Sequence, residues 1–266
     1  MTMYESAFSD HVEAVERLAA AGIPAPKEWT DLLNRYQTFT AMTSDAQRRL
    51  TEAVLDGNTD EVDELRAFAL IEAASNAEHR AAVNNFVGAA VATRLTNLYE
   101  PSAEKSFVKA AALFNAAAKR FTGFADLVDP DMDADVVVTL NDAQRQAWGQ
   151  APVAVRDLDA ALAVLAEAAW LCGVSGVTSG ETLIALAMDT TDVDRRSIWE
   201  AWETVEGRCG RWAAVHKLGA PLAAADLDGF QPYRRPMPME ERWERVPGEI
   251  GHSRREYDPE TKQIVR

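Results

Sequence analysis

Apolar residues recur at helical spacing over about 40 residues between Thr59 and Glu100, and this run constrains the fold more than any other feature. Helices average roughly 11–12 residues, so a helix this long cannot be wrapped within a small globule. We predict a single helix that ends at Pro101, because proline lacks the N–H that continues a helix. It would serve as a strut of an antiparallel bundle or as part of an oligomer interface. The stripe consists of Val62, Leu65, Phe68 or Ala69, Ile71, Val83, Phe86 or Val87, Ala90 or Val91, Leu95 and Leu98.

A further helix is predicted to start at Ser102, because a seam of apolar residues follows at alternating spacings of three and four, as in coiled coils. We expect this helix to fold back on the long one as an αα-hairpin. Residues 1–128 are therefore predicted to be a helical bundle with a long central helix. The seam consists of Phe107, Ala111, Phe114, Ala118, Phe121 and Phe124.

The helical pattern breaks after residue 128, and residues 129–155 are predicted to be an acidic loop and connector. The alternating carboxylates of Asp129, Asp131, Asp133 and Asp135 resemble the start of a calcium-binding loop, but the glycine and glutamate that such a loop needs are missing. A solvated acidic loop is the favoured interpretation, and cation binding stays open. One short strand could form at residues 136–138, and a short helix is expected near 141–149. Residues 156–228 are predicted to be a second helical region.

Composition supports an all-α fold and limits the partners. The chain contains 47 alanines, the best helix formers, and its formal net charge is −15. Such an acidic chain is a poor candidate for a general nucleic-acid binder, which needs a basic face to replace phosphate counterions. No stretch is apolar and long enough for a membrane span. The excess of arginine over lysine, 21 to 6, together with the alanine content, is typical of proteins from GC-rich bacterial genomes and their phages.

The C-terminal residues 229–266 differ in composition from the rest of the chain, with no alanine and five of the eleven prolines. We predict an extended arm that ends in a short β-hairpin. A disordered solubilising tail would lack large apolar groups, so the arm either docks on a protein partner or packs on its own domain. Docking on a partner is favoured. The candidate interaction residues of the arm are Tyr233, Arg234, Arg235, Met237, Met239, Trp243, Tyr257 and Ile264.

A second candidate interaction surface is the tryptophan-rich segment with Trp199, Trp202 and Trp212. The favoured interpretation is the core face of an amphipathic helix. The alternative is an interface anchor, since tryptophan and arginine dominate binding hot spots and arginines lie close by in the sequence.

The sequence contains no catalytic or cofactor-binding motif that we can identify. Its two cysteines, Cys172 and Cys209, form neither a disulfide framework nor a CxxC pair. No histidine follows a glutamate at the spacing of a di-metal bundle, and the glycine-rich stretch 173–180 lacks the Lys-Ser/Thr of a phosphate loop. We therefore expect no catalytic, cofactor or metal residues and no small-molecule ligand.

These observations favour a non-enzymatic structural or assembly protein, most concretely a phage virion component of the head–tail connector or scaffold type. The expected partners are proteins, including copies of the same chain, in the cytoplasm or in a virion. The alternative is an intracellular adaptor or regulator of the host, whose acidic helical body binds one protein partner. A helical enzyme without a recognisable motif is the third option.

Overall fold

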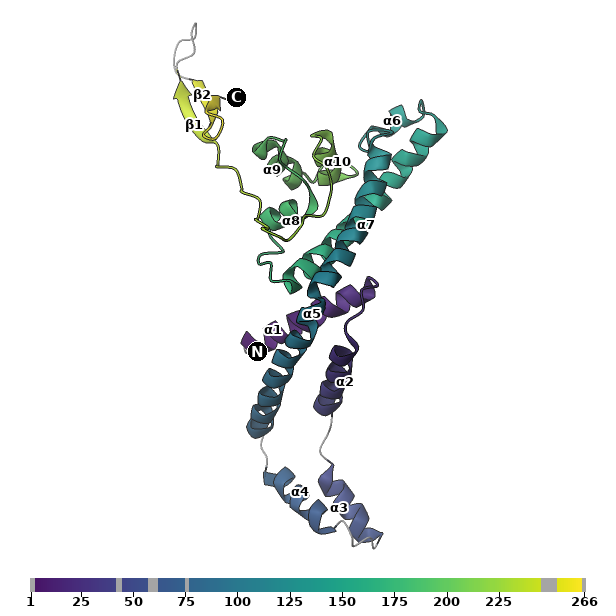
Figure 1. Cartoon of the computed structure of the whole chain (residues 1–266), viewed down its shortest axis with the longest axis vertical. Helices are drawn as coiled ribbons and strands as arrows, with labels where there is room; N and C mark the ends of the chain where they lie inside the picture. Colours follow the sequence, from purple (N-terminus) through teal and green to yellow (C-terminus); the bar gives the residue numbers. More distant parts are fainter. Residues whose placement is uncertain (1–2, 42–44, 57–61, 75–76, 245–252, 265–266) are drawn as a thin grey trace. The chain divides into compact units, whose positions relative to one another are not determined.

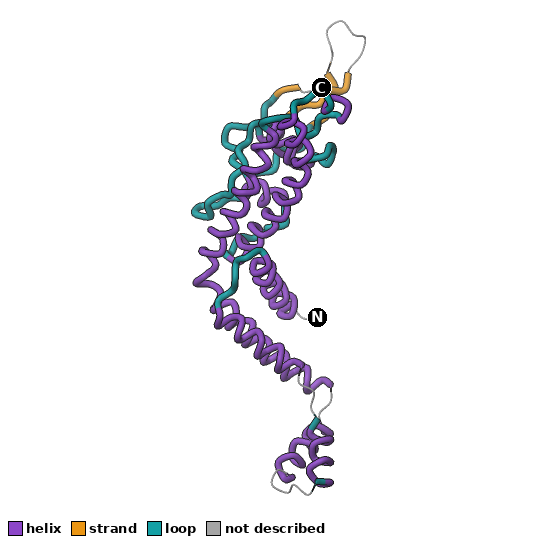
Figure 2. Tube along the Cα trace, turned by 90° about the vertical axis from the view of Figure 1, so that its right-hand side faces the viewer, coloured by secondary structure: helices purple, strands orange, loops and turns teal. Residues whose placement is uncertain are grey.

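The computed structural model describes residues 3–41, 45–56, 62–74, 77–244 and 253–264. The described chain is helical apart from a small antiparallel sheet near the C-terminus, which confirms the predicted all-α class with a terminal hairpin (Figures 1 and 2). The helices are α1 Met3–Ala20, α2 Lys27–Ala41, α3 Ala46–Leu55, α4 Val62–Ala74, α5 Ala77–Ala125, α6 Ala134–Val137, α7 Asp142–Leu171, α8 Gly180–Ala187, α9 Arg195–Glu203 and α10 Gly210–Lys217. The chain divides into two compact units, unit 1 (Met1–Lys105) and unit 2 (Ser106–Arg266).

Helix α5 corrects two predictions, because it runs without a break through Pro101 to Ala125. Proline removes the hydrogen bond to the carbonyl of Asn97, but both residues are exposed, so water can reach that carbonyl. The neighbouring turns are anchored by Tyr99 and Ala103, which are buried. The predicted helix stop at Pro101 is therefore wrong. The predicted αα-hairpin is wrong as well, since its two halves are one helix.

The start of the predicted long helix also differs from the structure. Its first part is a separate helix, α4, which ends at Ala74, and α5 begins at Ala77. Helix α4 lies against α3. The periodic stripe therefore lies on two described helices, and residues 75–76 between them lie outside the described residues.

The interior of unit 1 is built by α1, α2 and the first part of α5. Leu18 and Leu95 are fully buried there. His11 accepts a hydrogen bond from the Trp29 indole at 3.3 Å and meets the Tyr99 ring edge-on at 5.9 Å between ring centroids. Burial lowers the pKa of His11, because desolvation disfavours its charged form. The neutral imidazole is thus part of this core.

Unit 2 forms around the rest of α5, α7 and the short helices after it. Phe107, Phe114 and Phe121 of the predicted seam are buried. Their neighbours lie in unit 2: Phe114 contacts Trp212 at 6.3 Å between ring centroids, and Arg120 of α5 pairs with Asp157 of α7. Helices α5 and α7 run side by side here (Figures 1 and 2). The seam is thus a contact surface, and the elements that meet it come from later in the chain.

The predicted connector is mostly helical. Residues 136–138 form no strand; Val136 and Val137 belong to the short helix α6. Helix α7 then begins with a capping box, in which the Asn141 side chain accepts from the N–H of Gln144 and the Gln144 side chain accepts from the N–H of Asn141. It continues through Pro152, so the predicted short helix 141–149 and the helix from 156 are one element.

The C-terminal sheet has the order β1-β2-β3, with β1 Glu240–Glu244, β2 Ser253–Asp258 and β3 Gln263–Ile264. All pairs are antiparallel, with Trp243 opposite Arg254 and Tyr257 opposite both Glu240 and Ile264. The Asp-Pro turn predicted from the sequence joins β2 to β3. The pairing of β1 with β2 adds a strand that the sequence pattern does not predict, because β1 is highly charged and lacks apolar alternation.

Candidate protein interface

The first residues of the arm dock on α8 and α9 of the same chain. The Tyr233 N–H donates to the carbonyl of Glu181 at 2.9 Å, and the Tyr233 hydroxyl donates to the carbonyl of Arg195 at 2.6 Å. Burial raises the pKa of Tyr233 to about 12, so this hydroxyl stays a donor at neutral pH. The Arg235 guanidinium lies 4.8 Å above the Trp199 ring, a cation–π contact.

A buried ion pair holds the sheet to α9. Arg196 donates two hydrogen bonds of 2.9 Å to the carboxylate of Asp258, and a third, of 2.7 Å, to the carbonyl of Met237. The Asp258 side chain is almost fully buried, and the Arg196 guanidinium holds its pKa far below the usual range. Glu260 adds an ion pair to Arg195 at 3.1 Å. These contacts match the alternative in which the arm packs on its own domain.

Beyond these anchors, the predicted arm residues differ in exposure. Trp243 is 67% exposed and Ile264 is 45% exposed, while Tyr257 lies beneath the Arg242 guanidinium at 3.2 Å. Met237 is exposed and Met239 is half-buried. The arm therefore presents Trp243 and Ile264 as its large apolar groups on the sheet, and their role in binding a partner stays a prediction.

The three tryptophans of the second candidate surface lie in the interior of unit 2. Trp202 and Trp212 meet edge-on at 5.5 Å between ring centroids, and the Trp212 indole donates to Asp159 at 2.9 Å. Trp199 packs close to Gly180. All three side chains are buried, which fits the core interpretation and leaves little of them for a partner to touch.

Asp129, Asp133 and Asp135 of the acidic loop are exposed, in agreement with a solvated loop, while Asp131 and Asp129 also bind their own chain. Asp131 accepts the Cys209 N–H at 2.8 Å, and Asp129 pairs with Lys217 at 3.0 Å. Gly207 has a φ of +84°, and a Cβ there would come within 2.6 Å of the Asp131 carboxylate. Burial and the nearby Asp131 raise the pKa of the Cys209 thiol to about 11, so it is a poor nucleophile at neutral pH. Within the described ranges, no three His, Cys, Asp or Glu side chains gather closely enough to hold a metal ion.

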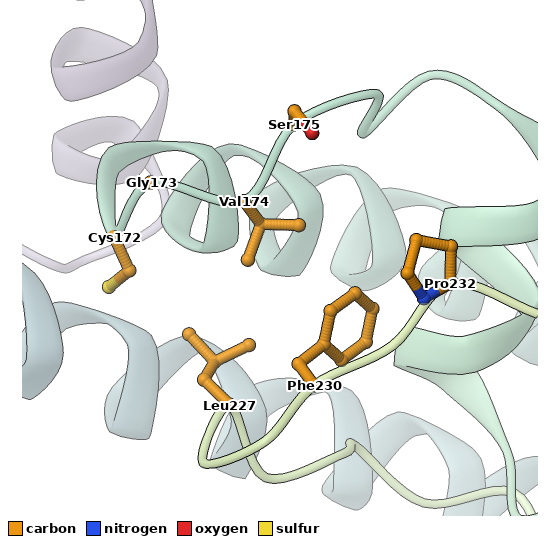
Figure 3. Close-up of a pocket in the computed structure, with 7 residues that line it drawn as sticks. All are labelled: Cys172, Gly173, Val174, Ser175, Leu227, Phe230 and Pro232. Carbon is orange, nitrogen blue, oxygen red and sulfur yellow. The ribbon is translucent and has the colours of Figure 1, made fainter.

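A cavity of about 290 Å³ lies between the loop after α7 and the chain leading into the arm. In Figure 3, Val174 faces Leu227 and Phe230 across this space, and Pro232 closes one side. Its other lining residues are Cys172, Gly173 and Ser175. The cavity therefore combines the apolar side chains of Val174, Leu227, Phe230 and Pro232 with the Cys172 thiol and the Ser175 hydroxyl.

A group of exposed apolar side chains lies in unit 1, on α3, α4 and the start of α5, and it includes Phe68, Ile71, Val83 and Phe86 of the predicted apolar stripe. Phe68 is 51% exposed, Leu70 63% and Phe86 79%. The signal was present in the sequence, since Phe68, Leu70 and Ile71 occupy more of the helix circumference than one neighbouring helix can cover. We call this group the unit 1 apolar surface; it consists of Val54, Leu55, Phe68, Leu70, Ile71, Val83 and Phe86.

No family model matches the chain, and no curated protein or solved structure matches it at a significant level. None of the described helices combines the length and the apolar character that crossing a membrane requires.

Proposed function

We propose that this chain is a non-enzymatic structural or assembly protein that works through protein–protein contacts. The observation that carries the proposal is the unit 1 apolar surface, with seven large apolar side chains exposed. Clustered exposed apolar groups on a folded protein mark interaction sites, whereas single ones are ordinary, and Phe68, Leu70 and Ile71 lie within four consecutive residues of α4. Burying a fully exposed leucine, isoleucine or phenylalanine is worth about 1.5–3 kcal/mol, so burial of these side chains against a protein partner would be favourable.

Helix α4 supports the proposal most directly. Its last turns, from Ala67 to Ala74, carry a single charged residue, Glu72. Leu65 and Ala69 are buried, while Phe68, Leu70 and Ile71 are exposed on other sides of the helix. The second half of α4 thus carries apolar side chains on more than one side, more than α3 alone covers, which supports a further partner for this helix.

The concrete form of the proposal is a phage virion component of the head–tail connector or scaffold type. It is supported by the alanine-rich composition with 21 arginines against 6 lysines and by a helix of 49 residues, α5. Long helices of this kind commonly act as struts or contact surfaces in assemblies. Detection of the chain in purified particles would test this form, and its absence from them would contradict it.

The general proposal is tested by the solution mass of the full chain, measured by sedimentation over a range of concentrations. We expect a mass above the 29.2 kDa of one chain. The double variant Phe68→Glu with Ile71→Glu should return the protein to a monomer, because two charges would then have to be buried in the contact. The matched control is Arg66→Glu, which changes charge at an exposed position of the same helix and should leave the mass unchanged.

Two outcomes would contradict the proposal. One is a chain that stays monomeric at every concentration and whose arm can be deleted without affecting any assembly. The other is a salt-sensitive one-to-one complex with a basic protein that the double variant leaves intact, which would favour the adaptor alternative.

A further inference from the structure

A second cavity, of about 360 Å³, lies where the first residues of the arm meet the loop between α8 and α9. One wall is formed by the arm and the other by the α8–α9 loop and the start of α9. The lining residues are Thr190, Thr191, Val193, Arg195, Tyr233 and Arg234. This cavity is formed by residues of unit 2 alone, so the inference drawn from it does not rest on the unit 1 apolar surface.

The charge of this lining is opposite to that of the protein. The whole chain has a formal net charge of −15, yet the charged residues among the six that line the cavity are Arg195 and Arg234. Among the ion pairs of the described residues, Arg195 has Glu260 as its partner and Arg234 takes part in none. Glu260 already offsets the charge of Arg195, and the Asp189 carboxylate holds Thr191, so Arg234 is the lining cation with which an added anion would pair.

The hydrogen-bond donors of the lining also suit an anion. Arg195 gives one N–H to Glu260 at 3.1 Å, and a guanidinium has five. The Thr191 hydroxyl is already donated to Asp189 at 2.6 Å, so Thr190 supplies the hydroxyl that can turn toward a ligand. Tyr233 gives its hydroxyl proton to the carbonyl of Arg195 and serves as a wall. The available donors are therefore two guanidinium groups and one hydroxyl.

We propose that this cavity binds the phosphate group of a small molecule. Arginine matches phosphate oxygens with pairs of parallel hydrogen bonds, and a phosphate offers more acceptor oxygens than a carboxylate does to the two guanidinium groups and the Thr190 hydroxyl. The volume lies within the range of small-molecule sites, so it has room for a phosphate and part of the group that carries it.

Binding at this position also has a consequence for the arm. Because one wall is the arm and the other belongs to the helical body, the ligand would bind only when the arm is docked. A ligand that binds only the docked state shifts the equilibrium toward that state. Phosphate should therefore protect the peptide bonds near Arg234 from proteolysis.

The test uses the full chain and isothermal titration with inorganic phosphate, phenyl phosphate and acetate at constant ionic strength. We expect saturable binding of phosphate and phenyl phosphate and much weaker binding of acetate. Arg234→Gln should lower the phosphate affinity about tenfold or more, because it removes a charged donor. Thr190→Val should lower it severalfold, which provides a second variant at a neutral position. The matched control is Arg254→Gln, since Arg254 pairs with Glu241 within the C-terminal sheet and neither lines the cavity nor docks the arm on α9.

Three results would overturn the proposal. The first is no saturable binding of either phosphate compound. The second is an equal loss of affinity in the Arg234 and Arg254 variants, which would indicate general attraction to the basic residues of the arm. The third is acetate binding as tightly as phosphate, which would make this a carboxylate site.

Discussion

Helices α4 and α9 show how differently two apolar helices of this chain are covered. In unit 2, α9 carries Trp199 and Trp202, and both rings are buried by α8, α10 and the arm. In unit 1, α4 carries Phe68, Leu70 and Ile71, and all three are more than half exposed. Apolar content alone therefore does not tell a core helix from a contact helix. What distinguishes them is whether distant segments of the same chain return to cover them.

The largest effect should come from Trp212, at the centre of the covered region. Trp212→Ala removes ring contacts to Phe114 and Trp202 and a hydrogen bond to Asp159. We expect the free energy of unfolding of unit 2 to fall by about 3–5 kcal/mol, measured by urea denaturation. A loss below about 1 kcal/mol would mean that Trp212 is not closely packed, and the contrast with α4 would weaken.

The next effect concerns the backbone of the same unit. Gly207→Ala places a methyl group against the Asp131 carboxylate at a positive φ, which we expect to cost about 2 kcal/mol or more of unfolding free energy. Gly149→Ala is the matched control, because Gly149 lies within α7 with no atom near its added Cβ. That change should be neutral or stabilising by up to about 1 kcal/mol. If both variants lost the same unfolding free energy, the close packing of Gly207 against the Asp131 carboxylate would be contradicted.

A smaller, pH-dependent effect should appear in unit 1. His11 has a lowered pKa in the folded chain, so the unfolded chain binds more protons as the pH falls below about 6.5. Stability from the neutral imidazole is thus present at neutral pH and lost on acidification. Urea denaturation at about pH 7.5 and about pH 5 should show this loss in the native chain.

The control for this effect is His11→Gln, which does not titrate. Its unfolding free energy should change less between the two pH values. If both proteins lost the same amount, another group would be responsible.

The smallest effect on the stability of one chain should come from the exposed helix. Leu70→Gln should change the unfolding free energy of dilute, monomeric protein by no more than about 0.5 kcal/mol, because the side chain is 63% exposed. Circular-dichroism denaturation at low concentration measures this. A loss of about 2 kcal/mol would show that Leu70 is covered by its own chain, and the contrast between α4 and α9 would disappear.

Local features of the fold were predictable from the sequence, and features that depend on distant partners were not. The spacing of Phe107, Phe114 and Phe121 predicts an apolar seam, and all three are buried. The partner predicted for the seam is wrong, because spacing identifies an apolar face without identifying what meets it. Pro101 predicts a helix end on local grounds, while the buried neighbours on both sides of it keep the helix continuous.

The candidate sites follow the same division. Composition is enough to recognise the arm, and its aromatic side chains set it apart from a solubilising tail. That Tyr233 and Asp258 are held by α9 could not be read from the sequence, since Arg196 and Asp258 lie 62 residues apart. The cavity at Arg195 and Arg234 likewise forms only because the arm packs against the α8–α9 loop and the start of α9.

By itself, the sequence determined that the protein is helical, that it is acidic and that its last residues form a differently built arm. Alanine content, helical spacing and proline placement are local properties, and they act on each segment before it meets any other. Only the tertiary structure decided which apolar faces are covered. Coverage depends on the free energy gained when distant segments meet. In this chain, contacts between distant segments bury the tryptophans of α9 and α10. Within the described part of the chain, no such contact covers Phe68, Leu70 and Ile71 of α4, which are exposed.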